Sequence, residues 1–394
     1  MAKKPEVSRN EYLSMKTPLK YGVNPHQGKA FISNSSEDLR VLNGTPGYIN
    51  FLDALTAWQL VMELAASTGK ASAASFKHVS PAGAAVAAPL SSEFLNSQFL
   101  GSGDPSPIAT AYARARGGDR MCSFGDAVAV SEKVDESLAL LLKSEVSDLI
   151  IAPEYDETAL DILRRKKSGA YIVLQMNPAY EPPATEQRQL FGFNFEQERN
   201  SVLISKDLFL GTSPEVAESL LVGTIALKYA QSNSVCVAYD GQVIGLGVGQ
   251  QSRIHCTRLA CDKADKWMMQ FHPKVQALVF EKGLTKPDKA NIVDQYLLWD
   301  ELSYLEQKDV ISKLKIVPES ISRKEKVAWV REFDKLCLSS DAYIPFRDNI
   351  DRAARSNVQF VAHPGGSVRD ELIKNACQEH NICLLETGLR CFLH

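Results

Sequence analysis

The sequence has 394 residues, of which 45% are hydrophobic and 23% are charged, and its formal net charge is −3. This composition is ordinary for a soluble globular protein, and the length suits two domains or one long α/β domain with a duplicated core. A nearly neutral chain has no overall field that would recruit nucleic acid or an anionic membrane, so an anionic substrate would have to meet locally placed cations or helix termini.

The amino-terminal residues and the cysteines indicate a cytoplasmic protein. Residues 1–17 are polar and lack the apolar stretch of a secretory signal, and apolar runs such as 138–142 are too short to cross a bilayer. The eight cysteines include no CxxC pair, and most stand in apolar contexts, as buried free thiols do. A reducing compartment suits such a chain.

The first strong signal along the chain surrounds Lys77 and His78. A helix is predicted over 50–66 and a buried strand over 71–76, and Ser80-Pro81 is typical of the N-cap and first residue of a helix. Lys77 and His78 would then lie between the carboxyl end of a strand and a helix amino end, where α/β sheets bind ligands and anions. The alternative is that they are ordinary polar turn residues.

The chain then alternates between strand and helix signals. Residues 93–107 are expected to form a loop, and the arginine-rich 112–120 segment is interpreted as a solvated charged face. The proline-rich 177–200 segment is interpreted as an excursion between two halves. The alternation predicts a largely parallel, helix-covered sheet, with strands at 127–130, 148–152 and 171–176 and helices at 135–145 and 156–167.

The second half repeats this alternation. A helix is expected over 215–229, and Asp240-Gly241 predicts a hairpin between strands 235–239 and 242–246. The glycines at 245, 247 and 249 do not match G-x-G-x-x-G, so no dinucleotide site is expected there, although such a turn suits anions or carbonyl groups. Helical, charged sequence runs to about residue 337, and strands and helices follow at 339–344, 350–356, 358–362, 368–380 and 382–385.

Several kinds of catalytic site are excluded by spacing. The histidines form no HxxxH pair, and no H-x-E with P-C-x-x-C, G-x-S-x-G or phosphate-binding P-loop motif occurs. What remains is acid–base or group-transfer chemistry at turns beside predicted sheet edges, which needs a histidine near its operating pKa and a cation. The candidates are Lys77, His78, Asn233, Arg253 and Asp348.

Seven segments, in this order, resemble the family of 5-aminoimidazole-4-carboxamide ribonucleotide (AICAR) formyltransferases, the transformylase half of the bifunctional purine biosynthesis protein. They are 21–27 (YGVNPHQ), 74–85 (ASFKHVSPAGAA), 112–121 (YARARGGDRM), 231–235 (QSNSV), 249–260 (GQQSRIHCTRLA), 340–349 (SDAYIPFRDN) and 364–367 (PGGS). A single motif of this kind is weak evidence for a family. Seven motifs in the family's order are not expected to arise by chance.

The resemblance implies a fold of two tandem cytidine-deaminase-like three-layer α/β/α units without zinc. The first unit would cover 18–200 and the second 201–394, with a helical insertion at about 268–337, after an amino-terminal tail at 1–17. Members of this family work as homodimers with active sites built across the interface. The resemblance also suggests a structural monovalent cation such as potassium.

The family reaction moves the formyl group of 10-formyltetrahydrofolate to the 5-amino group of AICAR, giving 5-formyl-AICAR and tetrahydrofolate in IMP biosynthesis. The resemblance implies that His78 is the general base, that Lys77 stabilises the oxyanion or protonates the departing folate nitrogen, and that Asn233 lies near the carboxamide. AICAR would contact Lys20, Tyr21, Asn50, Arg253 and Arg390, and the folate would contact Asn291, Tyr343, Pro345, Phe346 and Asp348.

Two departures from the family pattern matter. Lys20 stands where the family usually has arginine, so phosphate binding would be kept without the bidentate fork. Only about 17 residues precede the match, so no cyclohydrolase activity is expected. Two alternatives are a zinc-free deaminase or hydrolase acting on a nucleotide base, and a non-catalytic nucleotide-binding scaffold. The missing metal triad opposes the first, and the retained polar turn residues oppose the second.

Overall fold

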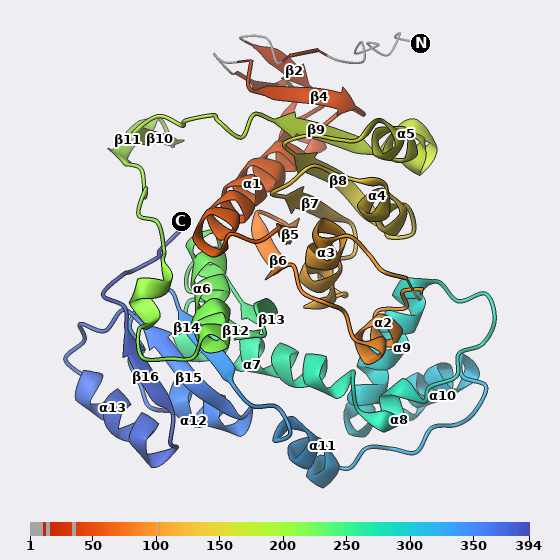
Figure 1. Ribbon diagram of the computed structural model, residues 1–394, viewed down its shortest axis with the longest axis vertical. Helices are drawn as coiled ribbons and strands as arrows, with labels where there is room; N and C mark the ends of the chain where they lie inside the picture. The colour runs from red at the N-terminus through yellow and green to blue at the C-terminus, as the bar shows by residue number, and fades with distance from the viewer. Residues whose placement is uncertain (1–10, 13–15, 34–36, 102) are drawn as a thin grey trace.

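The computed structural model describes residues 11–12, 16–33, 37–101 and 103–394. Its centre is one mixed twelve-stranded sheet (Figure 1). In spatial order the strands are β1 (Glu11–Tyr12), β4 (Leu39–Asn43), β9 (Ile172–Met176), β8 (Ser147–Ala152), β7 (Asp126–Val130), β5 (Ser72–Lys77), β6 (Ser80–Val86), β13 (Gln242–Gly247), β12 (Val235–Tyr239), β14 (Leu336–Ser340), β15 (Val358–His363) and β16 (Cys383–Glu386).

The two halves of the sheet repeat one pairing pattern. In the first half β5 pairs antiparallel with β6 and β7, and β7, β8 and β9 run parallel. In the second half β12 pairs antiparallel with β13 and β14, and β14, β15 and β16 run parallel. The halves meet where β6 and β13 pair antiparallel, with Ala85 opposite Gln242. The expected parallel pairing is therefore right only for β7, β8 and β9 and for β14, β15 and β16, because β4 and β1 at the first end of the sheet pair antiparallel.

Helices cover both faces of this sheet and make three layers (Figure 1). On one face α1 (Tyr48–Thr68) and α6 (Pro214–Lys228) pack against each other over a single hydrophobic core that spans both halves. The other face has two separate cores. One lies beneath α3 (Pro107–Gly117), α4 (Glu136–Lys143) and α5 (Glu157–Arg165), and one beneath α7 (Arg253–Met269), α12 (Asp348–Arg355) and α13 (Asp370–Glu379).

Two glycines explain how α7 approaches the sheet so closely. A Cβ atom on Gly245 would lie 2.1 Å from the main-chain oxygen of Ala260, and one on Gly247 would lie 2.2 Å from that of Cys256. Glycine is therefore required at both positions of β13 because the helix backbone occupies the space of a side chain. The first two glycines of the Gly-x-Gly-x-Gly pattern thus serve helix packing, whereas Gly249 has open space around it and a positive φ of 67°.

The segment in which a helical insertion is expected is helical along much of its length. It contains α8 (Pro273–Gln276), α9 (Lys286–Leu297), α10 (Tyr304–Ser312) and α11 (Arg323–Val330), which lie at the lower right of Figure 1. Lys286 ties this segment to the first half, because its Nζ atom donates hydrogen bonds to Glu145 Oε1 at 2.8 Å and to Ser144 Oγ at 2.9 Å.

The segment between the halves carries a hairpin that the sequence did not reveal. Strands β10 (Thr185–Leu190) and β11 (Phe193–Glu198) pair only with each other, and the hairpin projects from the body of the molecule (Figure 1). Every residue of both strands is exposed. The division of the chain at residue 200 stays a prediction.

Three local expectations were wrong. Ser80-Pro81 begins strand β6 and not a helix, because residues 80–86 pair with β5. Helix α3 packs on the small side chains of β6, and a Cβ atom on Gly83 would meet the Ala115 main-chain oxygen at 2.1 Å. The expected loop contains α2 (Ser92–Ser97), whose first turn is capped by Ser91 Oγ. Arg114 and Arg116 are buried, each 3% exposed, and do not form a solvated face.

The amino-terminal region adds a second small sheet, β2 (Thr17–Leu19) with β3 (Ala30–Ile32). Most of the predicted tail, residues 1–10 and 13–15, lies outside the described residues. Among the helices of the described ranges, none combines the length and the hydropathy needed to span a membrane.

Candidate active site

Lys77 and His78 lie at the tip of the β5–β6 hairpin. Lys77 pairs with Ser80, so His78 and Val79 form the turn, and both have left-handed backbones with φ of 55° and 59°. His78 is exposed. The expected helix amino end is absent from this turn, so an anion here would be met by side chains and not by a helix dipole.

The turn is held from two sides. The Lys77 Nζ atom donates a hydrogen bond to the Phe124 main-chain oxygen at 2.6 Å and lies 5.8 Å from the centre of the Phe124 ring. The Val79 main-chain N–H donates to Asp53 Oδ1, on α1, at 2.6 Å. Burial raises the pKa of Asp53 above its ordinary value, although the Val79 N–H and the nearby His78 partly oppose that rise.

The loop that receives Lys77 rests on a buried polar network. Arg116 donates from Nη1 to the Ser123 main-chain oxygen at 2.7 Å and forms ion pairs with Asp126 at 2.9 Å and Glu145 at 3.1 Å. Ser75 Oγ donates to Asp126 Oδ2 at 2.8 Å. Strand β5 and the Phe124 loop are therefore fixed relative to each other, which fixes the base of the Lys77 side chain.

Asn233 and Arg253 form a second cluster, in the second half. Arg253 Nη2 donates to Asn233 Oδ1 at 2.7 Å, and Asn233 Nδ2 donates to the Gln250 main-chain oxygen at 2.9 Å. Arg253 is only 7% exposed and also donates from Nη1 to Ser340 Oγ at 2.9 Å and to Asp341 Oδ1. Its guanidinium is thus directed at protein groups.

Asp341 joins this cluster to the end of the chain. Its carboxylate is buried and accepts hydrogen bonds from the Ser234 N–H at 3.0 Å and from Ser232 Oγ at 2.7 Å. Its main-chain oxygen accepts from the Cys391 N–H at 2.8 Å. Arg390 beside it is exposed, with its Cζ atom 4.9 Å from the centre of the Phe392 ring.

The Lys77–His78 turn and the Asn233–Arg253 cluster lie at the same end of the central strands, but they are apart from each other. Strands β5, β6, β13 and β12 alternate in direction, so the carboxyl end of β5 and the amino end of β12 share one edge. Three strand spacings separate β5 from β12, or about 14 Å. Within the described part of the chain, no hydrogen bond or ion pair joins Lys77 or His78 to Asn233 or Arg253.

The loop after β14 presents the residues expected to bind folate. Tyr343 and Phe346 are 48% and 51% exposed, Pro345 is half-buried, and Asp348 is exposed. Below them the Ile344 N–H donates to Nδ1 of buried His363 at 3.3 Å, and burial lowers the pKa of His363. Such exposed aromatic side chains can stack on a planar ring.

The remaining predicted residues are dispersed. Lys20 is exposed, with Nζ 5.5 Å from the centre of its neighbour's ring, Tyr21. Asn50 Oδ1 accepts the Gly47 N–H at 2.9 Å and so caps α1. Asn291 is exposed on α9. Within the described residues, no hydrogen bond or ion pair joins Lys20 or Tyr21 to the turn of Lys77.

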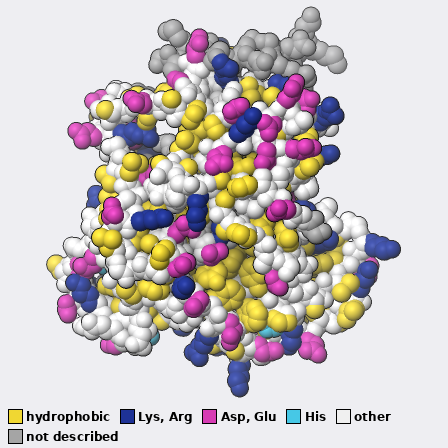
Figure 2. Space-filling model, viewed as in Figure 1, with side chains coloured by type: hydrophobic (Ala, Val, Ile, Leu, Met, Phe, Trp, Pro, Cys, Tyr) yellow, Lys and Arg dark blue, Asp and Glu magenta, His cyan; other side chains and the backbone are white. Residues whose placement is uncertain are grey.

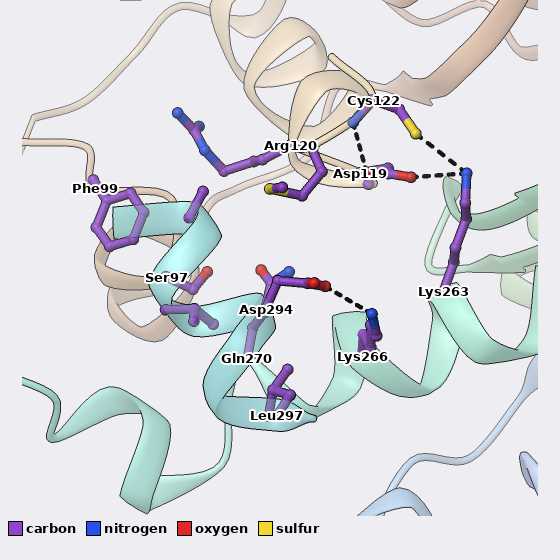
Figure 3. Close-up of a pocket in the computed structure, with 14 residues that line it drawn as sticks. Ser97, Phe99, Asp119, Arg120, Cys122, Lys263, Lys266, Gln270, Asp294 and Leu297 are labelled. Carbon is purple, nitrogen blue, oxygen red and sulfur yellow. Dashed lines mark hydrogen bonds and ion pairs between the residues drawn. The ribbon is translucent and has the colours of Figure 1, made fainter. Parts of the chain in front are cut away.

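A cavity of about 270 Å³ lies on the opposite face of the sheet from α1 and α6, between the 118–122 loop, α7 and α9 (Figure 3). Its charges are already paired, since Lys263 contacts Asp119 at 2.9 Å and Lys266 contacts Asp294 at 2.8 Å. No sequence pattern indicates this cavity, because it depends on how the helical segment packs against the first half. In the ranges that the structure describes, no group of three or more His, Cys, Asp and Glu side chains could hold a metal ion.

Comparison with known proteins identifies close similarity to one family. A family model described as the AICARFT/IMPCHase bienzyme matches residues 2–263. The bifunctional purine biosynthesis protein PurH of Aquifex aeolicus is 29% identical over 386 residues, covering 95% of this chain and 59% of the relative. PurH of Clostridium perfringens (strain SM101 / Type A) is 27% identical over 396 residues, covering 98% and 61%. The chain thus spans about three fifths of the length of these relatives.

Proposed function

Because the chain belongs to the AICARFT/IMPCHase bienzyme family, we propose that it transfers the formyl group of 10-formyltetrahydrofolate to the 5-amino group of AICAR in purine biosynthesis. The observation that carries the proposal is the turn of Lys77 and His78, where an exposed imidazole stands beside an ammonium group anchored at a fixed point.

The chemistry proposed for the pair balances its protons and bonds. The 5-amino nitrogen attacks the formyl carbon while the His78 imidazole accepts the amine proton. The bond between the formyl carbon and the folate nitrogen then breaks, and Lys77 stabilises the oxyanion and supplies the proton that the folate nitrogen takes up. An ammonium group has three donors, so the bond from Lys77 to Phe124 leaves two for this work.

The other roles follow the family. We propose that Asn233 orients the carboxamide and that the exposed Lys20 and Arg390 and the half-buried Tyr21 contact the nucleotide, with Asn50 near it. The folate would lie against Asn291, Tyr343, Pro345, Phe346 and Asp348. The closed hydrogen-bond set of Arg253 supports a role in holding Asn233 more than a direct contact with AICAR.

We propose that the protein works as a homodimer. The separation of about 14 Å between the two clusters favours a site completed by a second chain. The β10–β11 hairpin also has apolar side chains that nothing in one chain covers: Leu190, Phe191, Phe193 and Phe195 are 57%, 97%, 71% and 57% exposed. An isolated two-stranded hairpin is at best marginally stable in water, which favours a partner.

The remaining parts of the proposal concern fold, ions and location. The repeated pairing pattern supports two tandem deaminase-like units. The visible face carries charges of both signs, mixed with apolar side chains that gather in its lower central part (Figure 2), which suits small-molecule substrates better than nucleic acid. We expect a cytoplasmic enzyme without cyclohydrolase activity, and a potassium requirement stays a prediction.

The direct test is turnover. Purified protein is incubated with AICAR and 10-formyltetrahydrofolate while tetrahydrofolate is followed, with K⁺ replaced by Na⁺ in a second series. We expect the wild-type protein to transfer the formyl group, and His78→Ala to do so about 10²- to 10⁴-fold more slowly. We expect no formation of IMP when 5-formyl-AICAR is supplied. His380→Ala, which removes an exposed histidine at the C-cap of α13, is the matched control. No formyl transfer by the wild-type protein would refute the proposal and favour the scaffold alternative.

A further inference from the structure

The turn that carries Lys77 and His78 is built from residues that its backbone disfavours. His78 and Val79 both have positive φ, at 55° and 59°. A β-branched residue such as valine is rare in this left-handed region because its side chain crowds the backbone. Strain of this kind persists only where the surroundings hold it, and it gathers at functional sites.

The second half of the protein supplies an internal comparison. Its β12–β13 hairpin has the same two-residue turn, in which Tyr239 pairs with Gln242. There the turn residues are Asp240 and Gly241, with φ of 48° and 68°. Asp-Gly is the pair that this turn geometry favours. The first hairpin therefore has a strained turn where the second has a relaxed one.

The helix before each hairpin contacts the turn in the same way. Counted from Tyr48, Asp53 is the sixth residue of α1, and counted from Pro214, Ser219 is the sixth residue of α6. Each accepts the N–H of the second turn residue: Asp53 Oδ1 accepts from Val79 at 2.6 Å, and Ser219 Oγ accepts from Gly241 at 3.1 Å. The strained turn thus has a buried carboxylate where the relaxed turn has a neutral hydroxyl.

The two turns also differ in what surrounds them. The Gly241 oxygen accepts the Val86 N–H at 3.1 Å, and Asp240 forms an ion pair with Arg114, so the second turn is packed against the first half. His78, by contrast, is exposed. The carboxylate of Asp53 is 6% exposed, and its hydrogen bond is the charge-assisted kind, which is shorter and stronger than a neutral one.

We propose that Asp53 is a positioning residue for the Lys77–His78 pair. Its carboxylate holds Val79, and through Val79 the whole turn, in the left-handed conformation. This fixes the direction of the His78 imidazole relative to Lys77, whose Nζ is held separately by Phe124. The expected effect of Asp53 on catalysis rests on the proposed function. The role of Asp53 in holding the turn does not.

The test combines three variants with a matched control. Asp53→Ala removes the acceptor, Asp53→Asn keeps an amide oxygen that can accept the N–H, and Asp53→Ala/Val79→Gly removes both the acceptor and the strain, since glycine adopts positive φ freely. Thr56→Ala is the control, because Thr56 is a half-buried residue of the same helix, α1, and its hydroxyl donates to the Leu52 oxygen of that helix at 2.8 Å.

The first readout is hydrogen exchange at the turn, measured by mass spectrometry of peptides covering residues 76–82. We expect exchange about tenfold faster or more in Asp53→Ala, the size expected for a lost hydrogen bond to a charged group. We expect a smaller increase in Asp53→Asn, whose neutral amide oxygen accepts a weaker bond, and exchange close to wild type in Thr56→Ala. Equal exchange in Asp53→Ala and Thr56→Ala would overturn the proposal whether or not the protein transfers formyl groups.

The second readout is kinetic. We expect kcat to fall by about 10²-fold in Asp53→Ala with a much smaller change in KM, because the reacting groups are misplaced while the substrate surfaces remain. Adding Val79→Gly should recover most of that loss. If kcat falls equally in Asp53→Ala and in Asp53→Ala/Val79→Gly, the claim that backbone strain at Val79 displaces the turn is overturned. Absence of wild-type turnover would refute the proposed function and leave the exchange experiment to decide the role of Asp53.

Discussion

Arg253 Nη2 donates a hydrogen bond to Asn233 Oδ1 at 2.7 Å, from the first residue of α7 to the loop before β12. The two residues lie in different sequence segments, and the fold brings them into contact. Because Gln250 accepts from Asn233 Nδ2 at 2.9 Å, the amide is oriented by both of its ends. An amide so fixed offers a defined surface to a substrate group.

The first prediction concerns the charge of Arg253. Arg253→Met should destabilise the protein by about 3–5 kcal/mol, because the buried carboxylate of Asp341 loses its cation. Arg253→Lys should destabilise it less, since the charge remains while the fork is lost. Urea unfolding followed by circular dichroism measures both. Arg258→Met, an exposed position on the same helix, is the control and should change stability little.

The second prediction is a dependence of stability on pH through His363. Burial holds its folded-state pKa below the ordinary value of 6.5, so the unfolded chain binds the proton first as the solution is acidified. The stability that neutral His363 contributes is full above pH 6.5 and is lost as the pH falls toward the lowered pKa. The charged side chains that act on it are Asp370, Glu386, Lys374 and Arg253.

Comparison of unfolding midpoints at pH 7.5 and 5.5 checks this prediction. His363→Gln should lose less stability between the two pH values than wild type, because glutamine can still accept the Ile344 N–H and does not titrate. His255→Gln, at an exposed position of α7, should behave as wild type. A wild-type difference that persists unchanged in His363→Gln would contradict the assignment.

The third prediction concerns the approach of α7 to β13. Gly247→Ala would place a Cβ atom 2.2 Å from the Cys256 oxygen, so the start of α7, and Arg253 with it, must shift. We expect a loss of about 1–3 kcal/mol in unfolding free energy and weaker formyl transfer. Gly101→Ala, where the added atom would meet nothing within 4 Å, should leave both unchanged.

The fourth prediction concerns the β10–β11 hairpin. Replacing Phe191 and Phe193 together by serine should shift the protein toward monomer in sedimentation equilibrium, because the exposed rings are what a second chain would cover. Replacing Gln187 and Gln189 by serine on the same hairpin is the control. A wild-type monomer, or a variant as dimeric as wild type, would contradict the proposed role of the β10–β11 hairpin in the dimer.

Much of the secondary structure could be predicted because its signals are local. Asp135 caps α4 by accepting the Leu138 N–H at 2.9 Å, and Asp240-Gly241 forms the expected turn. Short buried strands such as β8 also stand where their apolar runs predict them. These elements need no knowledge of the rest of the chain.

The errors arose where packing overrides a local signal. Ser80-Pro81 has the sequence of a helix start, yet these residues form a strand. Pro81 can occupy its position in β6, and Gly83 allows α3 to pack closely on that strand. Arg116 looks solvated in sequence but is neutralised by Asp126 and Glu145, which are distant along the chain. Such compensation is invisible without the fold.

The candidate site was foreseen in part. Asn233 and Arg253 do meet, and Lys77 and His78 do stand at an exposed turn at the same edge of the sheet. Asp53 was missed because it lies within the apolar stripe of α1, where the sequence gives no reason to separate one acidic residue from a helix face. Only the geometry of the Val79 N–H reveals it.

The single core beneath α1 and α6 has a consequence for how the molecule can come apart. Residues such as Leu60 of the first half and Ile225 of the second belong to that one core, whereas the opposite face has a separate core for each half. Separating the halves would expose the shared layer to water along its full length. Despite its duplicated topology the chain should therefore melt in one cooperative transition, and neither half expressed alone should reach a stable native state.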